Sequence, residues 1–131
     1  GYNIESITVG ASELDGLRRI IIVTDIEEVE QIQKQLHKLI NTIKVTNLSE
    51  MSFVDRELAL IKVSSKINRS EIIEISSLFR SRIIDVADDS MIIEALGDNE
   101  KISSLIQILT PYGIKEVSRT GTIAMGRGKS K

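Results

Sequence analysis

The chain has 131 residues and a formal net charge of −2, a length that suits one ordinary domain or two small ones. This slight acidity gives no electrostatic footprint for nucleic acid, and the absence of cysteine excludes disulfides, zinc–thiolate sites and thiol chemistry. Aromatic residues make up only 3% of the chain, so Ile, Leu and Val must fill the core. No apolar run approaches the roughly 20 residues that span a bilayer, and no signal peptide is visible. We therefore expect a soluble intracellular protein.

The first half of the chain predicts three strands around one helix. Residues 4–9 (IESITV) and 17–24 (LRRIIIVT) have the β-branched composition of strands, and a turn-rich segment separates them. Residues 42–48 (TIKVTNL) alternate as a third strand, with Ile43 and Val45 facing inward.

The helix between these strands is expected to begin near Ile26. Asp25 stands at the N-cap position, and Glu28 lies three residues later to complete a capping box. Asn41 is expected to end the helix. Five apolar residues at helical spacing form the predicted inner stripe: Val29, Ile32, Leu36, Leu39 and Ile40.

The pattern restarts after a polar segment at residues 49–56, which is the expected domain boundary. Residues 58–63 (LALIKV) are nearly all apolar, as in a central strand that is buried on both faces. Residues 83–87 and 91–96 predict a hairpin around a tight turn, and residues 114–124 form the last predicted strand.

Two helices lie between the strands of this second half. Asn68 is the expected N-cap of the first, with Glu71 at the capping-box position, and the second is expected to stop at residues 110–113. Each helix has one apolar stripe. The first stripe is Ile72, Ile75 and Phe79, and the second is Ile102, Leu105, Ile106 and Leu109.

The order of elements predicts an α+β protein built from two ferredoxin-like modules. Residues 51–131 read βαββαβ and form a complete module, whereas residues 1–50 read ββαβ and lack the leading strand and helix. Without that strand, two apolar strand edges would lie unpaired in water. We therefore expect about 25 residues to precede Gly1 in the natural chain.

Few residues carry recognisable chemistry, and no catalytic residue or metal site is predicted. His37 is the only histidine and has no companion ligand, so we expect it in solvent or at the edge of the helix's apolar stripe. Four acidic residues gather near the predicted hairpin, where turns favour Asp in any case: Asp85, Asp88, Asp89 and Glu94. Residues 126–130 (GRGKS) lack the earlier glycine of a phosphate-binding loop, because position 123 is Ile; residues 126–131 are therefore read as a short basic tail.

Two places are candidates for contact with another protein. Arg56 and Glu57 precede the apolar strand, and their pairing is open between an interface ion pair and an exposed pair of little energetic value. Arg119 and Arg127 lie in the last strand and beyond it among glycines that permit close backbone approach, so an interaction edge is favoured there.

Four stretches, in order and over nearly the whole chain, resemble the small, regulatory subunit of acetolactate synthase (acetohydroxyacid synthase). They are GYNIESITVG at 1–10, EQIQKQLHKL at 30–39, DRELALIKV at 55–63 and RTGTIAMGRG at 119–128. The resemblance implies an N-terminal ACT domain, which is a βαββαβ module that binds amino acids, over residues 1–50. It implies a ferredoxin-like C-terminal domain over residues 51–131.

The resemblance also implies a function without catalysis by this chain. Small subunits of this family bind the large catalytic subunit, raise its activity and confer feedback inhibition by valine in branched-chain amino-acid biosynthesis. The thiamine diphosphate, the divalent metal ion (Mg²⁺) and the FAD belong to that partner, so no cofactor is expected here. Arg56, Glu57, Arg119 and Arg127 become candidates for the subunit interface. The implied location is the bacterial cytoplasm or the plastid stroma.

In this family the effector lies between two ACT domains, which implies a homodimer. Asn3 matches the effector-contacting asparagine, and Ile4 beside it can offer its backbone. Two alternatives stay open: an ACT-type amino-acid sensor that controls a different partner protein, and an autonomous ferredoxin-like enzyme, which the shortage of reactive side chains disfavours.

Overall fold

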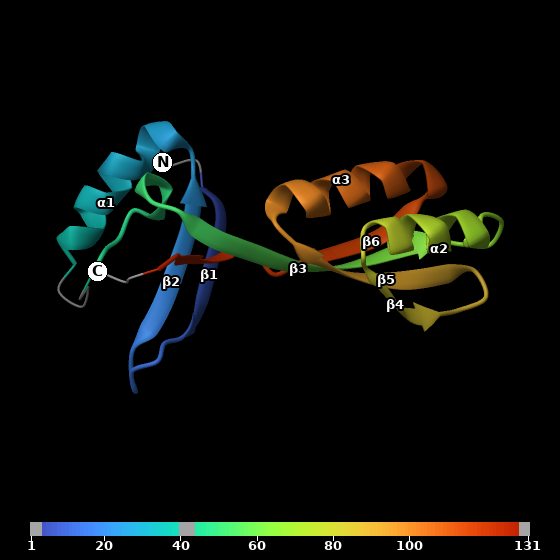
Figure 1. Ribbon diagram of the computed structural model, residues 1–131, viewed down its shortest axis with the longest axis horizontal. Helices are drawn as coiled ribbons and strands as arrows, with labels where there is room; N and C mark the ends of the chain where they lie inside the picture. Colours follow the sequence, from blue (N-terminus) through green and yellow to red (C-terminus); the bar gives the residue numbers. More distant parts are fainter. Residues whose placement is uncertain (1–3, 40–43, 129–131) are drawn as a thin grey trace. The chain divides into compact units, whose positions relative to one another are not determined.

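The computed structural model describes residues 4–39 and 44–128, which form two compact units. The first unit comprises Gly1–Asp55 together with Thr122–Lys131, and the second comprises Arg56–Gly121. Figure 1 shows the ribbon of the chain, coloured along the sequence from the N-terminus to the C-terminus. None of the helices in the described residues is long and apolar enough to cross a membrane.

The first unit is built on an antiparallel hairpin, with Val9 opposite Ile20 and Thr8 opposite Ile21. Its helix buries Ile32, which is 8% exposed, in agreement with the first part of the predicted stripe. The helix ends at His37 rather than near Asn41, so Leu39 lies beyond it and is 56% exposed, and Ile40 and Asn41 fall outside the described residues. The elements of this unit in chain order are β1 (Ile4–Ala11), β2 (Arg18–Thr24), η1 (Ile26–Glu28), α1 (Val29–His37), η2 (Leu48–Glu50), the start of β3 (Phe53–Ser64) and β7 (Ile123–Gly126).

The second unit confirms the ferredoxin-like prediction. Its strands lie in the order β4-β5-β3-β6, so that the first strand of the module is central, between the third and the fourth. Figure 1 shows α2 and α3 on one face of this sheet. The elements that follow β3 are α2 (Arg69–Leu78), β4 (Arg82–Val86), β5 (Ser90–Gly97), α3 (Asn99–Leu109), η3 (Thr110–Tyr112) and β6 (Ile114–Arg119).

The core of the second unit lies between this sheet and its two helices. Alternate residues of β3 point toward the helices, because successive side chains of a strand point to opposite faces. The fully buried apolar residues come from β3, β5 and both helices: Ala59, Ile61, Val63, Ile72, Met91, Ile93, Ala95, Ile102, Leu105 and Leu109. The predicted helix stripes are thereby confirmed.

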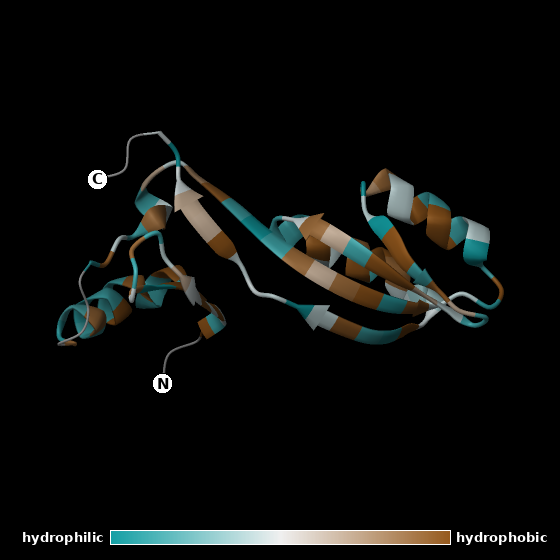
Figure 2. Cartoon of the chain, turned by 90° about the horizontal axis from the view of Figure 1, so that it is seen from below, coloured by the Kyte–Doolittle hydropathy of each residue, from teal (hydrophilic) through white to brown (hydrophobic). Residues whose placement is uncertain are grey.

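Strand β3 is nevertheless not buried on both faces, and that expectation was wrong. Leu60 is 38% exposed and Leu96 of β5 is 57% exposed, because helices of this unit cover only the other face of the sheet. Figure 2 shows a polar stretch and then an apolar stretch along this long strand, which correspond to residues 55–57 (DRE) and 58–61 (LALI). An apolar sequence run therefore marked a strand that buries one face only.

Two further predicted strands differ from the structure. Residues 44–47 form no regular structure and Leu48 begins η2, while Ile43 lies outside the described residues. No described strand pairs with residues 44–47, and backbone in an extended conformation needs such a partner to become a strand.

The predicted last strand is two strands, β6 and β7, separated by residues 120–122. Gly121 has a φ of 85°, a backbone conformation that interrupts a strand and that glycine adopts at little cost. Gly126 therefore belongs to β7 rather than to a tail.

Both predicted capping boxes are also absent. Asp25 makes no side-chain capping bond, because the chain begins there with a 3₁₀ turn in which the Glu28 N–H donates to the Asp25 carbonyl. Asn68 makes none either, and the Glu71 carboxylate instead accepts a hydrogen bond from Tyr112 Oη at 2.8 Å. Asp98 does cap α3, accepting from the Lys101 N–H at 2.8 Å.

Candidate functional site

The predicted effector residues lie at the N-terminal end of β1. Asn3 falls outside the described residues, whereas Ile4 is the first residue of β1 and is 39% exposed. The ladder with β2 is irregular between Ile4 and Ser6, and the Ser6 hydroxyl is buried without a hydrogen-bond partner. The backbone near Ile4 therefore departs from a regular ladder.

An aliphatic surface continues from this point along one face of the hairpin. Residues Ile7, Val9 and Ile20 are 54%, 60% and 58% exposed, and Val9 lies directly opposite Ile20 in the ladder. Since contiguous apolar side chains are rarely left in water, this hairpin face, defined by Ile7, Val9, Ile20 and the partly buried Ile22, suits contact with another apolar surface.

The structure brings together Glu57 and Arg119, two of the four predicted interface residues. Glu57 is only 4% exposed, and its Oε1 accepts from Arg119 Nε at 2.6 Å and lies 2.5 Å from Arg119 Nη2. The sequence left the pairing of Arg56 and Glu57 open, and the two are adjacent in β3, where neighbouring side chains point to opposite faces. Arg119 lies on β6, the strand that pairs directly with β3.

The other two predicted interface residues have exposed side chains in different parts of the chain. Arg56 opens the second unit within β3, and Arg127 follows β7 in the first unit. The Arg127 N–H donates to the Ser52 carbonyl at 2.9 Å, so its backbone is held in place although the residue is exposed.

One acidic residue of the β4–β5 hairpin, Asp89, forms an ion pair with a lysine. Asp89 Oδ2 lies 3.2 Å from Lys115 Nζ, and the hydrogen bond and charge of that lysine lower the pKa of Asp89. Within residues 4–39 and 44–128, no group of three or more His, Asp or Glu side chains is placed to hold a metal ion.

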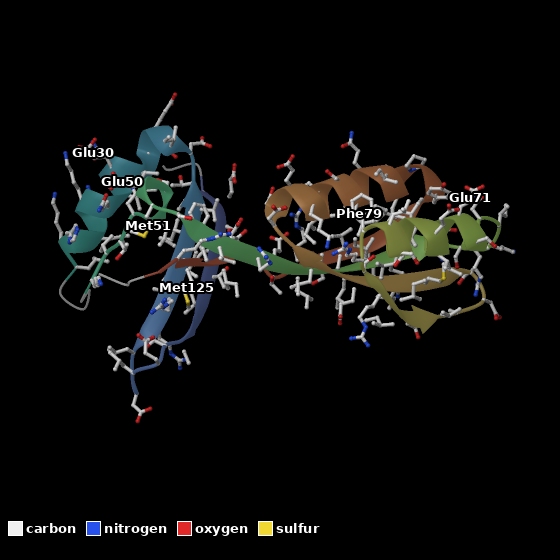
Figure 3. All side chains as sticks on the ribbon, viewed as in Figure 1. Glu30, Glu50, Met51, Glu71, Phe79 and Met125 are labelled. Atoms are coloured by element: carbon white, nitrogen blue, oxygen red, sulfur yellow. The ribbon has the colours of Figure 1, made fainter. Side chains whose placement is uncertain are left out.

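Tyr112 and His37 are the remaining polar residues considered as site candidates. Tyr112 Oη donates to Glu71, and this hydrogen bond, together with partial burial and the charges of Glu71 and Glu74, raises the pKa of Tyr112. Figure 3 shows Glu71 on α2. His37 is the last residue of α1 and is exposed, in agreement with the expectation that it faces solvent.

Comparison with known proteins covers both units. A family model described as the small subunit of acetolactate synthase matches residues 56–128, and one described as an AHAS small subunit-like ACT domain matches residues 1–44. The probable acetolactate synthase small subunit of Archaeoglobus fulgidus is 52% identical over all of this chain and 84% of its own length. The acetolactate synthase small subunit of Bacillus subtilis is 50% identical over 97% of this chain and 76% of its own length.

A solved structure shows the same likeness in three dimensions. The crystal structure of the acetolactate synthase small subunit from Thermotoga maritima superposes with a TM-score of 0.84 at 42% sequence identity. The alignment covers 99% of this chain and 83% of that one.

Proposed function

This chain belongs to the family of acetolactate synthase small subunits, and we propose that it is the regulatory subunit of that enzyme. In this proposal it binds the large catalytic subunit, raises its activity and makes it sensitive to inhibition by valine. Thiamine diphosphate, Mg²⁺ and FAD belong to the catalytic subunit. The bacterial and archaeal relatives support a cytoplasmic location.

The observation that carries the proposal is the position of the ACT-type match. It falls on residues 1–44, the part of the chain that contains Asn3, Ile4 and the aliphatic hairpin face. An amino-acid ligand needs amide and backbone groups for its carboxylate and ammonium, and an apolar wall for its side chain. Asn3 and the backbone of Ile4 supply the first, and aliphatic side chains of the hairpin supply the second.

The same surface supports a homodimer through the first unit. Ile7, Val9 and Ile20 are each more than half exposed, and contact with a second copy would remove this apolar area from water. A ligand that is shared by two chains binds according to their relative position, and such a ligand can therefore act as an allosteric effector.

For the catalytic subunit, we propose a contact that includes Arg56 and Arg127. Both residues are exposed, and Arg is enriched at protein interfaces because its planar donors bind carboxylates well. Within the second unit, Glu57 and Arg119 join β3 to β6, so their contribution is to position these two strands.

A binding experiment separates this proposal from an ACT-type sensor that controls another protein. The full-length protein is immobilised and incubated with the purified catalytic subunit of the same organism, with an unrelated thiamine-diphosphate enzyme as control. We expect selective retention of the catalytic subunit. If neither enzyme is retained while valine still binds the immobilised protein, the sensor reading is favoured instead.

The effector site is tested with Asn3→Ala in the full-length protein. Loss of a charge-assisted hydrogen bond to the ligand costs about 1.5–3 kcal/mol, so valine should inhibit the reconstituted enzyme about 10- to 150-fold more weakly. The measurement compares valine titrations with activity at saturating small subunit. Normal valine sensitivity would contradict the role of Asn3, and a parallel loss of activation and inhibition would assign it to the fold.

A further inference from the structure

The C-terminal segment Thr122–Gly128 belongs structurally to the first unit, although the family model for the second part of the chain extends to residue 128. Within this segment, β7 pairs with the beginning of β3, and the Arg127 N–H donates to the Ser52 carbonyl at 2.9 Å. In Figure 1 this red end of the ribbon lies within the same unit as β1 and β2. The segment is a strand added from the far end of the sequence.

The fit of this strand is close at Gly126. A Cβ atom at this position would lie 2.9 Å from Met51 Sδ and 3.8 Å from Leu48 Cδ2, so the side chains at η2 occupy the space that a larger residue would need. Figure 3 shows Met51 and Met125 in this region. The strand β7 therefore packs closely against the side chains at η2.

One side chain joins this strand directly to β1. Thr8 Oγ1 donates to the Thr122 carbonyl at 3.1 Å, across 114 residues of sequence. Thr122 is only 8% exposed. If the Thr8 hydroxyl were removed, the Thr122 carbonyl would lose its hydrogen-bond partner at a position where water replaces it poorly. Thr8 lies four residues beyond Ile4 on the same strand.

We propose that the segment Thr122–Gly128 is a strap that orders β1, and that Thr8 is the positioning residue that connects the two. The part of this inference that concerns regulation rests on the proposed function, in which valine binds at the N-terminal end of β1. Binding there orders β1 and, through Thr8, also the strap. Because coupling between two sites is reciprocal, an ordered strap in turn strengthens valine binding.

Hydrogen exchange followed by mass spectrometry tests the strap in the full-length protein, using peptides that cover β1 and β7. Thr8→Val keeps the shape and removes the donor, Thr8→Ser keeps the hydroxyl, and Thr46→Val is a matched change at an exposed residue of the same unit. Without valine, Thr8→Val should speed exchange of β7 roughly 2- to 10-fold. Thr8→Ser and Thr46→Val should match the wild type.

Valine then tests the coupling in the wild type and the variants. It should slow exchange in both β1 and β7 of the wild type, and Thr8→Val should weaken the effect on β7 more than the effect on β1. Unchanged β7 exchange in valine-free Thr8→Val would overturn the strap. Slowed exchange in β1 alone of the wild type would overturn the coupling, without any need for a variant.

The valine site and the strap can be disproved separately. If valine slows exchange nowhere in the wild type, the effector assignment under the proposed function is wrong. The comparison of Thr8→Val with Thr8→Ser in the absence of valine still decides whether Thr8 holds the strap.

Discussion

At the scale of single residues, Glu57 and Arg119 show how burial determines the value of an ion pair. Glu57 is 4% exposed in its side chain and Arg119 is 30% exposed, whereas the Lys62–Glu116 pair on the same two strands is 36% and 72% exposed. Removing one partner of a buried pair leaves a charge without compensation in the interior, and an exposed pair contributes little.

We therefore expect Arg119→Met to lower the free energy of unfolding by about 2–3 kcal/mol, somewhat less than for a fully buried pair because Arg119 keeps contact with water. Lys62→Met should lower it by less than about 1 kcal/mol. Urea denaturation monitored by circular dichroism measures both changes. The double variant Glu57→Leu/Arg119→Met should recover part of the loss, and equal losses for the two single variants would contradict this interpretation.

At the scale of elements, the end of α2 has a residue in an unfavourable backbone conformation. Arg80 has a φ of 53°, while its N–H donates to the Ser77 carbonyl and the Ser81 N–H donates to the Ser76 carbonyl. This pair of bonds is the Schellman motif, which usually has glycine at that position, because glycine adopts positive φ without a steric penalty from Cβ.

Arg80→Gly should consequently raise the free energy of unfolding by up to about 1 kcal/mol. Ser77→Gly, within the helix, is the matched control and should lower it by about 0.5 kcal/mol. Thermal and urea denaturation of both variants test the prediction. A loss of stability in Arg80→Gly would show that a contact of the Arg80 side chain stabilises the fold by more than the positive φ of that residue destabilises it.

Elements whose formation depends on local pattern could be predicted from the sequence. The stripe of α3 and the β4–β5 hairpin follow from spacing over a few residues, and both are confirmed. The break at Gly121 and the loss of a strand over residues 44–47 depend on which distant strand is available as a partner. Neither property can be read from the segment itself.

The candidate site was predictable to a similar extent. Its position at the start of the first strand followed from the resemblance, and Ile4 does open β1. The pairing of Glu57 was left open by the sequence, because its partner Arg119 lies 62 residues away. The Thr8–Thr122 bond was likewise missed, since a threonine in a strand gives no indication of the carbonyl it will meet.

At the scale of the whole molecule, the return of β7 to the first unit changes where the second unit ends. The sequence suggested that residues 51–131 form one module, whereas the compact second unit is Arg56–Gly121. We infer that this shorter segment is self-sufficient, since it contains the complete βαββαβ arrangement and its buried core.

A fragment of residues 56–121 should therefore unfold cooperatively, and hydrogen exchange should show protection in β3, β5 and α3. A fragment of residues 56–131 is the control and should have the same free energy of unfolding within about 0.5 kcal/mol, because the added residues have lost the first unit to which they bind. A markedly more stable longer fragment would contradict the assignment of β7 to the first unit.

The central claim is that this chain regulates a catalytic subunit, and reconstituted acetolactate synthesis tests it most directly. Acetolactate formation from pyruvate is measured for the full-length protein alone, for the catalytic subunit alone with thiamine diphosphate, Mg²⁺ and FAD, and for both together with and without valine. We expect no turnover by the small subunit alone, a higher rate for the mixture than for the catalytic subunit, and inhibition by valine only in the mixture. Turnover by the small subunit alone, or a mixture with the same rate and valine response as the catalytic subunit, would contradict the account.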